Sequence, residues 1–131
     1  MKKIYISMLA CLAFTFTSTA AHLSGNLLLT AKMTGDQEVP AVTTSAVGLG
    51  SFFLNENMDT LCINITAINL SGPITGIHVH QGAMGTNGGV VTDLTAYLNR
   101  NKVTATLTGS DLTPAMLKSY LAGNMYLNVH T

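Results

Sequence analysis

The amino-acid sequence predicts an all-β protein, an antiparallel sandwich with one short helix. Short segments rich in β-branched and aliphatic residues recur along the chain, turn-forming residues separate them, and several alternate between apolar and polar positions. The chain has 131 residues, which is the length of a single domain. Because 47% of the residues are hydrophobic and only 9% are charged, a chain of this length can bury one core.

The N-terminus has the pattern of an export signal. Lys2 and Lys3 give it a basic start, residues 4–16 are mostly apolar, and small residues suited to cleavage follow. The apolar run is too short for a membrane helix, which needs about 20 residues. We therefore predict a signal peptide over residues 1–21 and an exported domain over 22–131. This domain is periplasmic or extracellular, and no transmembrane span remains after the signal is removed.

The charge of the remaining domain argues against a nucleic-acid partner. Its basic residues number four and its acidic residues six, which gives a net charge of 4 − 6 = −2, and the basic residues are scattered. Cys62 is the one cysteine left after signal removal, so an internal disulfide is excluded. The core must therefore form without a stabilising disulfide bond.

Three strands are predicted in the first half of this domain. Residues 26–33 are mostly aliphatic, and residues 34–40 form a loop or sheet edge because their proline cannot donate to a ladder. Residues 45–54 and 60–68 form a hairpin around the polar turn at 55–59. The alternation in the third strand places four residues on the inner face: Leu61, Ile63, Ile65 and Ala67.

The second half begins with the sequence Gly-Ile-His-Val-His-Gln-Gly at residues 76–82, which we expect to be a strand. A loop follows over residues 81–89, since it contains four glycines. Residues 90–94 form a short strand and residues 102–108 a longer alternating one, which turns Val103, Ala105 and Leu107 inward.

One helix and a last strand complete the chain. Thr113 suits an N-cap, Pro114 the first helical position and Gly123 the C-terminal stop, so residues 113–123 form a helix of about two turns. Residues 124–131 form the last strand. In it Met125, Leu127 and Val129 alternate with Tyr126, Asn128 and His130.

Four segments together resemble the CHRD (chordin) domain of bacterial secreted proteins. They are Gly-Asp-Gln-Glu-Val-Pro at residues 35–40, the histidine segment at 76–82, Gly-Gly-Val-Val at 88–91, and residues 121–131. The resemblance runs from Leu27 to the last residue. It implies a Greek-key sandwich that is immunoglobulin-like or superoxide-dismutase-like. It implies little about activity, and the signalling-factor partners of animal chordins are not transferred to this chain.

The sequence departs from the family pattern at its end. In the family the histidine–threonine strand is usually followed by a turn and a closing strand, whereas the sequence stops at Thr131. We therefore expect either that the sequence is truncated or that the domain lacks its final strand. An unpaired edge in that place would favour pairing with another chain.

The histidine segment is the strongest candidate for chemistry. Side chains of a strand alternate, so His78 and His80 share one face, with Cα atoms roughly 6.6 Å apart. If the last strand lies beside this one, His130 joins them, and three imidazoles suit zinc or copper better than magnesium or calcium. The pattern also resembles the copper-ligand strand of copper/zinc superoxide dismutases, although the other histidines of that two-metal centre are missing. The alternative, which we favour from the sequence alone, is that the histidines bond the backbone and the Gly-rich loop.

No other residue indicates catalysis. We expect Glu38 to be a loop carboxylate that accepts backbone N–H bonds, Asp93 to lie in a turn or at a strand end, and Cys62 to lie on a polar face. A nucleophile elbow, a phosphate-binding loop and paired carboxylates are all missing from the sequence. The first hypothesis is therefore an extracytoplasmic binding or structural module, whose partner is a protein or an envelope component. The second is a metal-binding protein, similar to superoxide dismutase, that uses the three histidines to hold copper or zinc.

Overall fold

The computed structural model describes residues 3–7 and 25–131. The predicted signal peptide at residues 1–21 therefore lies outside the described residues, except for strand β1. The strands are β1 (Lys3–Ser7), β2 (Leu27–Thr34), β3 (Val47–Leu54), β4 (Thr60–Ile68), β5 (Gly76–Gln81), β6 (Gly89–Asp93), β7 (Leu98–Asn99), β8 (Lys102–Thr108) and β9 (Met125–His130). The helix is α1 (Pro114–Leu121), and single 3-10 turns are formed by Gly35–Gln37, Thr95–Tyr97 and Gly109–Asp111.

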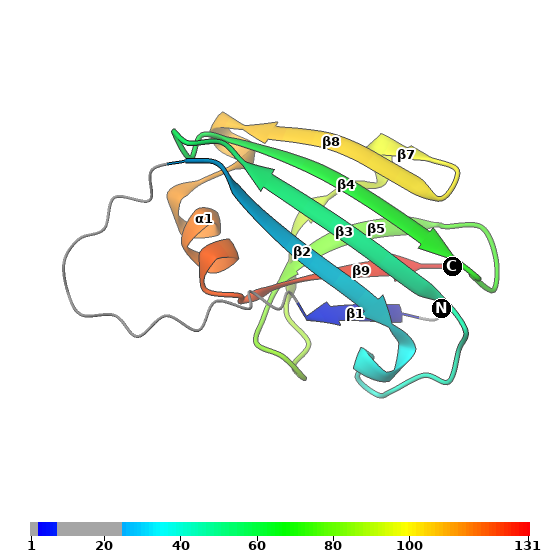
Figure 1. Cartoon of the computed structure of the whole chain (residues 1–131). Coiled ribbons are helices and arrows are strands. Elements are labelled where there is room, and N and C mark those ends of the chain that lie inside the picture. The colour runs from blue at the N-terminus through cyan, green and yellow to red at the C-terminus, as the bar shows by residue number, and fades with distance from the viewer. Residues whose placement is uncertain (1–2, 8–24) are drawn as a thin grey trace.

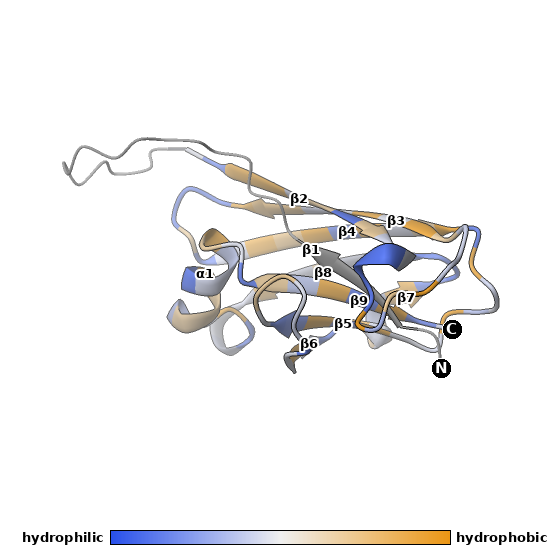
Figure 2. Ribbon diagram, turned by 90° about the horizontal axis from the view of Figure 1, so that it is seen from below, coloured by the Kyte–Doolittle hydropathy of each residue, from blue (hydrophilic) through white to orange (hydrophobic). Residues whose placement is uncertain are grey.

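The strands form two antiparallel layers that lie face to face (Figure 1). Sheet A consists of β6, β5 and β9 in that order, and sheet B consists of β2, β3, β4, β8 and β7. β1 pairs with β9 of sheet A and also with β2 of sheet B. Figure 2 shows the two layers from a second direction, with α1 at one end. The predicted antiparallel sandwich with one short helix is confirmed.

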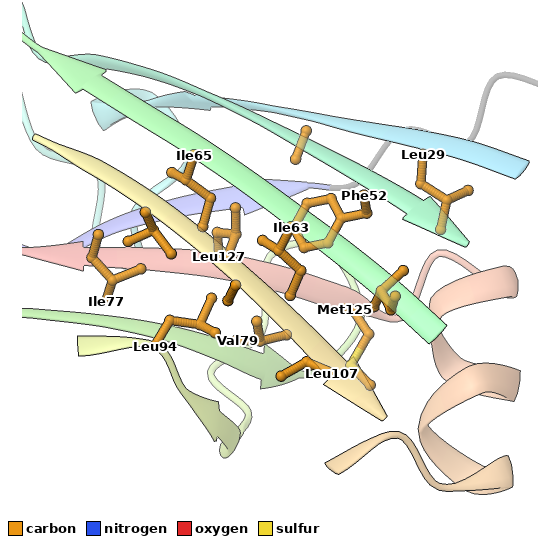
Figure 3. Packing of buried hydrophobic residues seen from close by; sticks show 14 of the residues in the cluster. Leu29, Phe52, Ile63, Ile65, Ile77, Val79, Leu94, Leu107, Met125 and Leu127 are labelled. Atoms are coloured by element: carbon orange, nitrogen blue, oxygen red, sulfur yellow. The ribbon is translucent and has the colours of Figure 1, made fainter. Parts of the chain in front are cut away.

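The hydrophobic core fills the space between the sheets because each alternating strand directs its apolar residues inward (Figure 3). Phe52, Ile63, Val79 and Leu127 are all fully buried there. Burying one such side chain contributes about 1.5–3 kcal/mol, so the core accounts for most of the stabilisation. Helix α1 closes one end of the core, where the rings of Tyr120 and Phe52 lie 6.0 Å apart.

Most element boundaries agree with the sequence. The strands predicted at residues 60–68 and 102–108 are β4 and β8. Helix α1 begins as expected, since the side chain of Thr113 accepts a hydrogen bond from the Met116 amide. Strand β3 begins two residues later than predicted, because the hydroxyl of Thr44 accepts the Ala46 amide in an irregular turn.

The two-residue strand β7 was not predicted, because it is too short to show any periodicity. Its pairing with β8 extends sheet B by one short edge strand. In the described part of the chain, none of the helices has the length and apolar character needed to cross a membrane.

Candidate functional site

The three predicted histidines meet on the outer face of sheet A. β5 and β9 are antiparallel neighbours, with His80 opposite Tyr126, His78 opposite Asn128, and Gly76 opposite His130. Directly opposed residues share a face, so the three histidines project from the same side of the sheet. Each offers a ring nitrogen, and these nitrogens lie within 4.8 Å of one another. Among the described residues, this is the one group of three or more His, Cys, Asp or Glu close enough to hold an ion.

His78 lies between His130 and Asp93. Its Nδ1 is 3.1 Å from Nε2 of His130, and its Nε2 is 3.7 Å from a carboxylate oxygen of Asp93. The hydrogen bonds that Thr95 donates lower the pKa of Asp93, and the neighbouring His78 lowers it further. Asp93 is therefore a carboxylate at neutral pH. A carboxylate beside Nε2 favours the tautomer with the proton on that nitrogen, which leaves the lone pair of His78 on Nδ1, facing His130.

His80 is oriented by the Gly-rich loop that follows β5. Its Nδ1 lies 3.0 Å from the carbonyl oxygen of Gly88. Because a carbonyl can only accept, Nδ1 donates, and the neutral ring carries its lone pair on Nε2. A β-bulge between Val79 and His80 shifts the pairing with β6, and such bulges commonly re-aim a side chain.

Tyr126 holds the same loop residue from the neighbouring strand. Its hydroxyl accepts a hydrogen bond from the Gly88 amide at 2.8 Å, and its ring stacks on His80 with centroids 5.0 Å apart. Gly88 also packs so closely on the backbone of Gln81 that a Cβ at this position would overlap the carbonyl oxygen. The loop is thereby fixed against the histidine face.

Asn128 adds a buried polar group to this face. It is only 1% exposed and lies directly opposite His78 in the sheet. Its side-chain oxygen has no hydrogen-bond partner among the described residues. Leaving such an oxygen buried and unpaired costs about 1–3 kcal/mol.

The sequence missed the parts played by Tyr126, Asn128 and Gly88. The alternation of β9 does assign Tyr126 and Asn128 to the face of His130, and this signal could have included them. Gly88 left no such signal, because its role depends on how the loop folds back. The contact between His80 and Gly88 is of the kind that the alternative interpretation expected for the histidines.

Of the other candidate residues, Asp93 lies beside His78, whereas Cys62 lies on the other sheet. Cys62 is on the outer face of sheet B, half-buried, with its sulfur 3.9 Å from the Thr106 hydroxyl. Asp93 ends β6, which confirms its predicted place at a strand end. Glu38 is only 5% exposed and, with the Gly-rich loop and Tyr126, lines a cavity of about 270 Å³. That it accepts backbone N–H bonds stays a prediction.

Comparison with known proteins gives one match. The family model of the CHRD domain matches residues 29–131, which is most of the chain and includes all four segments that carried the resemblance. Neither a curated protein nor a solved structure with significant similarity to the chain was found. The match covers the complete histidine face of sheet A.

Proposed function

Because the chain belongs to the CHRD domain family, we propose that it is an exported β-sandwich module that binds a divalent transition metal ion. The ion would be held by His78, His80 and His130 on the outer face of sheet A. Zinc and copper fit the three neutral imidazole nitrogens, whereas magnesium and calcium require oxygen ligands. This proposal gives a chemical identity to the ligand of a CHRD-type binding module.

The proposal rests chiefly on the spacing of the three imidazoles, whose nitrogens lie within 4.8 Å of one another. A metal–nitrogen bond is about 2.0–2.1 Å long, so two nitrogens on one tetrahedral ion are about 3.3 Å apart. Nδ1 of His78 and Nε2 of His130 are 3.1 Å apart, which is close to that separation. In the metal-free state one proton bridges these two nitrogens, and an ion would replace it. Small side-chain rotations would bring the third nitrogen into range.

The neighbours of the histidines support the same proposal. A metal-binding imidazole commonly donates a hydrogen bond from its other ring nitrogen to a carboxylate or a backbone carbonyl, and this bond fixes the tautomer. Asp93 supplies the carboxylate beside His78, and Gly88 supplies the carbonyl at His80. In each of these two histidines the lone pair is left on the other ring nitrogen.

The half-buried position of the three histidines leaves room for a fourth ligand from outside. Zinc sites with three protein ligands usually complete their shell with water or a bound molecule. We assign no catalytic residue.

Metal titration of the purified chain tests the proposal. The metal-free protein should bind one zinc or copper ion per chain, and the melting temperature should rise on binding. At an ion concentration 100 times Kd the expected stabilisation is about 2.7 kcal/mol. In the double variant His78→Ala/His80→Ala the rise should disappear, whereas the control Asn64→Ala/Thr66→Ala on sheet B should keep it. Equal binding by wild type and the histidine variant would refute the metal site, and a protein or envelope partner would then replace the metal as the proposed ligand.

Export is tested separately by the mass of the protein in cells. Processing predicts a periplasmic or secreted product that has lost residues 1–20 or 1–21, and intact-mass spectrometry distinguishes these from the full chain. Recovery of the unprocessed chain from the cytosol would refute export and leave the metal titration unaffected.

A further inference from the structure

We propose that the cavity between the loop after β2 and the Gly-rich loop binds a primary ammonium group on an aliphatic chain, either a small amine or a lysine side chain. The volume of this cavity is about 270 Å³. Ligand pockets commonly measure about 300–1,000 Å³, so this one suits a ligand at the small end of that range. Among the described residues that line it, none is one of the three histidines, so the proposal does not depend on the metal site.

Three segments that are distant in the sequence line this cavity. They are residues 36–39 after β2, residues 82–86 of the Gly-rich loop, and residues 123, 125 and 126 around the start of β9. Glu38 and Met125 are buried, whereas Asp36 and Met84 are exposed. The cavity therefore extends from the interior of the domain to its surface, and a small ligand can enter it.

The charged groups of the cavity are acidic. Asp36 and Glu38 both line it, and the described lining residues include no lysine, arginine or histidine. A hydrogen bond from the Thr34 side chain lowers the pKa of Asp36, and Lys32, which lies outside the lining, lowers it further. Asp36 is therefore a carboxylate at neutral pH. A cavity lined by one sign of charge attracts a ligand of the opposite sign, so a cation is favoured over an anion.

The other lining residues favour an organic cation over a metal ion. Val39, Ala83, Met84 and Met125 give the cavity apolar walls, against which the burial of methylene groups is favourable. Calcium takes about 6–8 oxygen ligands. Three or more ligating side chains come together only in the histidine cluster, as far as the described residues show. An ammonium group on an aliphatic chain matches both the carboxyl groups and the apolar walls.

Hydrogen bonds hold two of the lining segments in place. The carbonyl oxygen of Gly35 accepts bonds from the amides of Glu38 and Val42, at 3.2 and 2.8 Å. In the Gly-rich loop the carbonyl oxygen of Ala83 accepts bonds from the amide and the hydroxyl of Thr86, at 3.1 and 2.7 Å. The cavity is therefore formed before a ligand arrives, which lowers the entropy cost of ordering it on binding.

Titration of the full chain with pentylamine, followed by NMR of the backbone amides, tests the proposal. EDTA keeps the sample metal-free, so that the amine cannot bind through a metal at the histidines. Pentylamine should bind with a dissociation constant of about 1 mM or less, as is feasible for a ligand of its size. The shifted amides should be those of residues 36–39, 82–86 and 123–126. Pentan-1-ol should bind at least about 10-fold more weakly, because it cannot form a charge-assisted hydrogen bond.

Two variants test the residues that line the cavity. Glu38→Gln keeps the shape of the buried side chain without its charge, and should weaken pentylamine binding at least about 10-fold. Its matched control is Glu56→Gln, at an exposed carboxylate outside the cavity, which should leave the affinity unchanged. Met84→Lys adds an ammonium group at the exposed end, where folding tolerates it, and should also weaken binding. Met84→Leu is its control and should bind as wild type does.

The compound Nα-acetyl-lysine methylamide distinguishes the two sources of the ammonium group. Binding as tight as that of pentylamine would assign the cavity to a lysine side chain of another protein, and weaker binding would assign it to a free amine.

Any of four results would overturn the proposal. They are no binding of pentylamine, equal binding of pentylamine and pentan-1-ol, amide shifts outside the cavity, and wild-type affinity in the Met84→Lys variant. This last result decides the matter even where Glu38→Gln does not fold. Failure of the metal site would be seen in the zinc titration and would leave this metal-free assay unchanged.

Discussion

The two outer faces of the sandwich have the same strand geometry but very different surroundings. On β5 and β9 of sheet A the outward side chains are half-buried or buried, and the Gly-rich loop bonds His80 and Tyr126 through Gly88. On sheet B the outward residues Leu49 and Ile68 are 62% and 54% exposed. In Figure 2 both layers show apolar and polar residues mixed along their strands. The alternation of side chains along the strands therefore gives each sheet an outer face, and the Gly-rich loop beside sheet A distinguishes the face that carries the candidate site.

The largest effect is expected from Gly88→Ala, which disrupts the loop that distinguishes the two faces. The added Cβ would overlap the carbonyl oxygen of Gln81, so the loop must move and withdraw the Gly88 carbonyl from His80. Overpacking of this kind typically costs about 1–3 kcal/mol of unfolding free energy, measured by urea denaturation. Metal affinity, measured by calorimetry, should fall as well.

Gly89→Ala is the matched control for that substitution. A Cβ at Gly89 meets nothing within 4 Å, and the residue is exposed at the start of β6. Its unfolding free energy should change by less than about 0.5 kcal/mol. If both variants lost the same stability, the close packing of Gly88 would not be what fixes the loop.

A smaller effect on metal binding is expected from Asp93→Asn. Loss of a carboxylate beside a metal-binding histidine typically lowers metal affinity about 10-fold or more, since the tautomer of His78 is no longer favoured. The control Asp111→Asn, at an exposed carboxylate away from the histidines, should leave the affinity unchanged. An unchanged affinity in Asp93→Asn would mean that Asp93 does not orient His78.

The same variant has a pH signature. Hydrogen bonds from Thr95 lower the pKa of Asp93 in the folded protein. The stability that they contribute is therefore present above the unfolded pKa and is lost as the pH falls through the lowered folded pKa. Asp93→Asn should remove this part of the acid dependence, as seen in urea denaturation curves recorded between neutral and acid pH.

Tyr126→Phe separates the hydrogen bond to Gly88 from the stacking on His80. The phenyl ring can still stack, but the Gly88 amide loses its acceptor at 2.8 Å. The expected loss is about 1 kcal/mol of unfolding free energy. Tyr97→Phe is the control, because Tyr97 is 45% exposed. An equal loss in both variants would show that the Tyr126 hydroxyl does not hold the loop.

The sequence predicts the sandwich well because turn-forming residues mark both ends of its most regular strands. In β4 and β8 the alternation is strict and turn residues lie at both ends, so local pattern and final structure agree. The helix was predictable from Thr113 and Pro114 for the same reason: its start is encoded in adjacent residues. Alternation alone also assigned His78 and His80 to one face.

What the sequence could not predict depends on contacts between distant segments. The place of His130 beside His78 requires the pairing of β5 with β9. The approach of Asp93 requires the pairing of β5 with β6. The burial of Glu38 in a polar loop could not be predicted either, because Glu38 shares a cavity with the Gly-rich loop, which is distant in the sequence. Each of these features depends on tertiary contacts, which the local sequence pattern does not indicate.

The smallest effect is expected on the outer face of sheet B, where Leu49→Thr tests whether that face is free. Leu49 is 62% exposed, and threonine is well suited to a strand. The unfolding free energy should change by less than about 0.5 kcal/mol, and metal binding should be unaffected. A loss above about 1 kcal/mol would mean that Leu49 is covered in solution, since an exposed side chain has little contact to lose. The contrast between a covered face and a free one would then fail, and the site could no longer be explained by the Gly-rich loop alone.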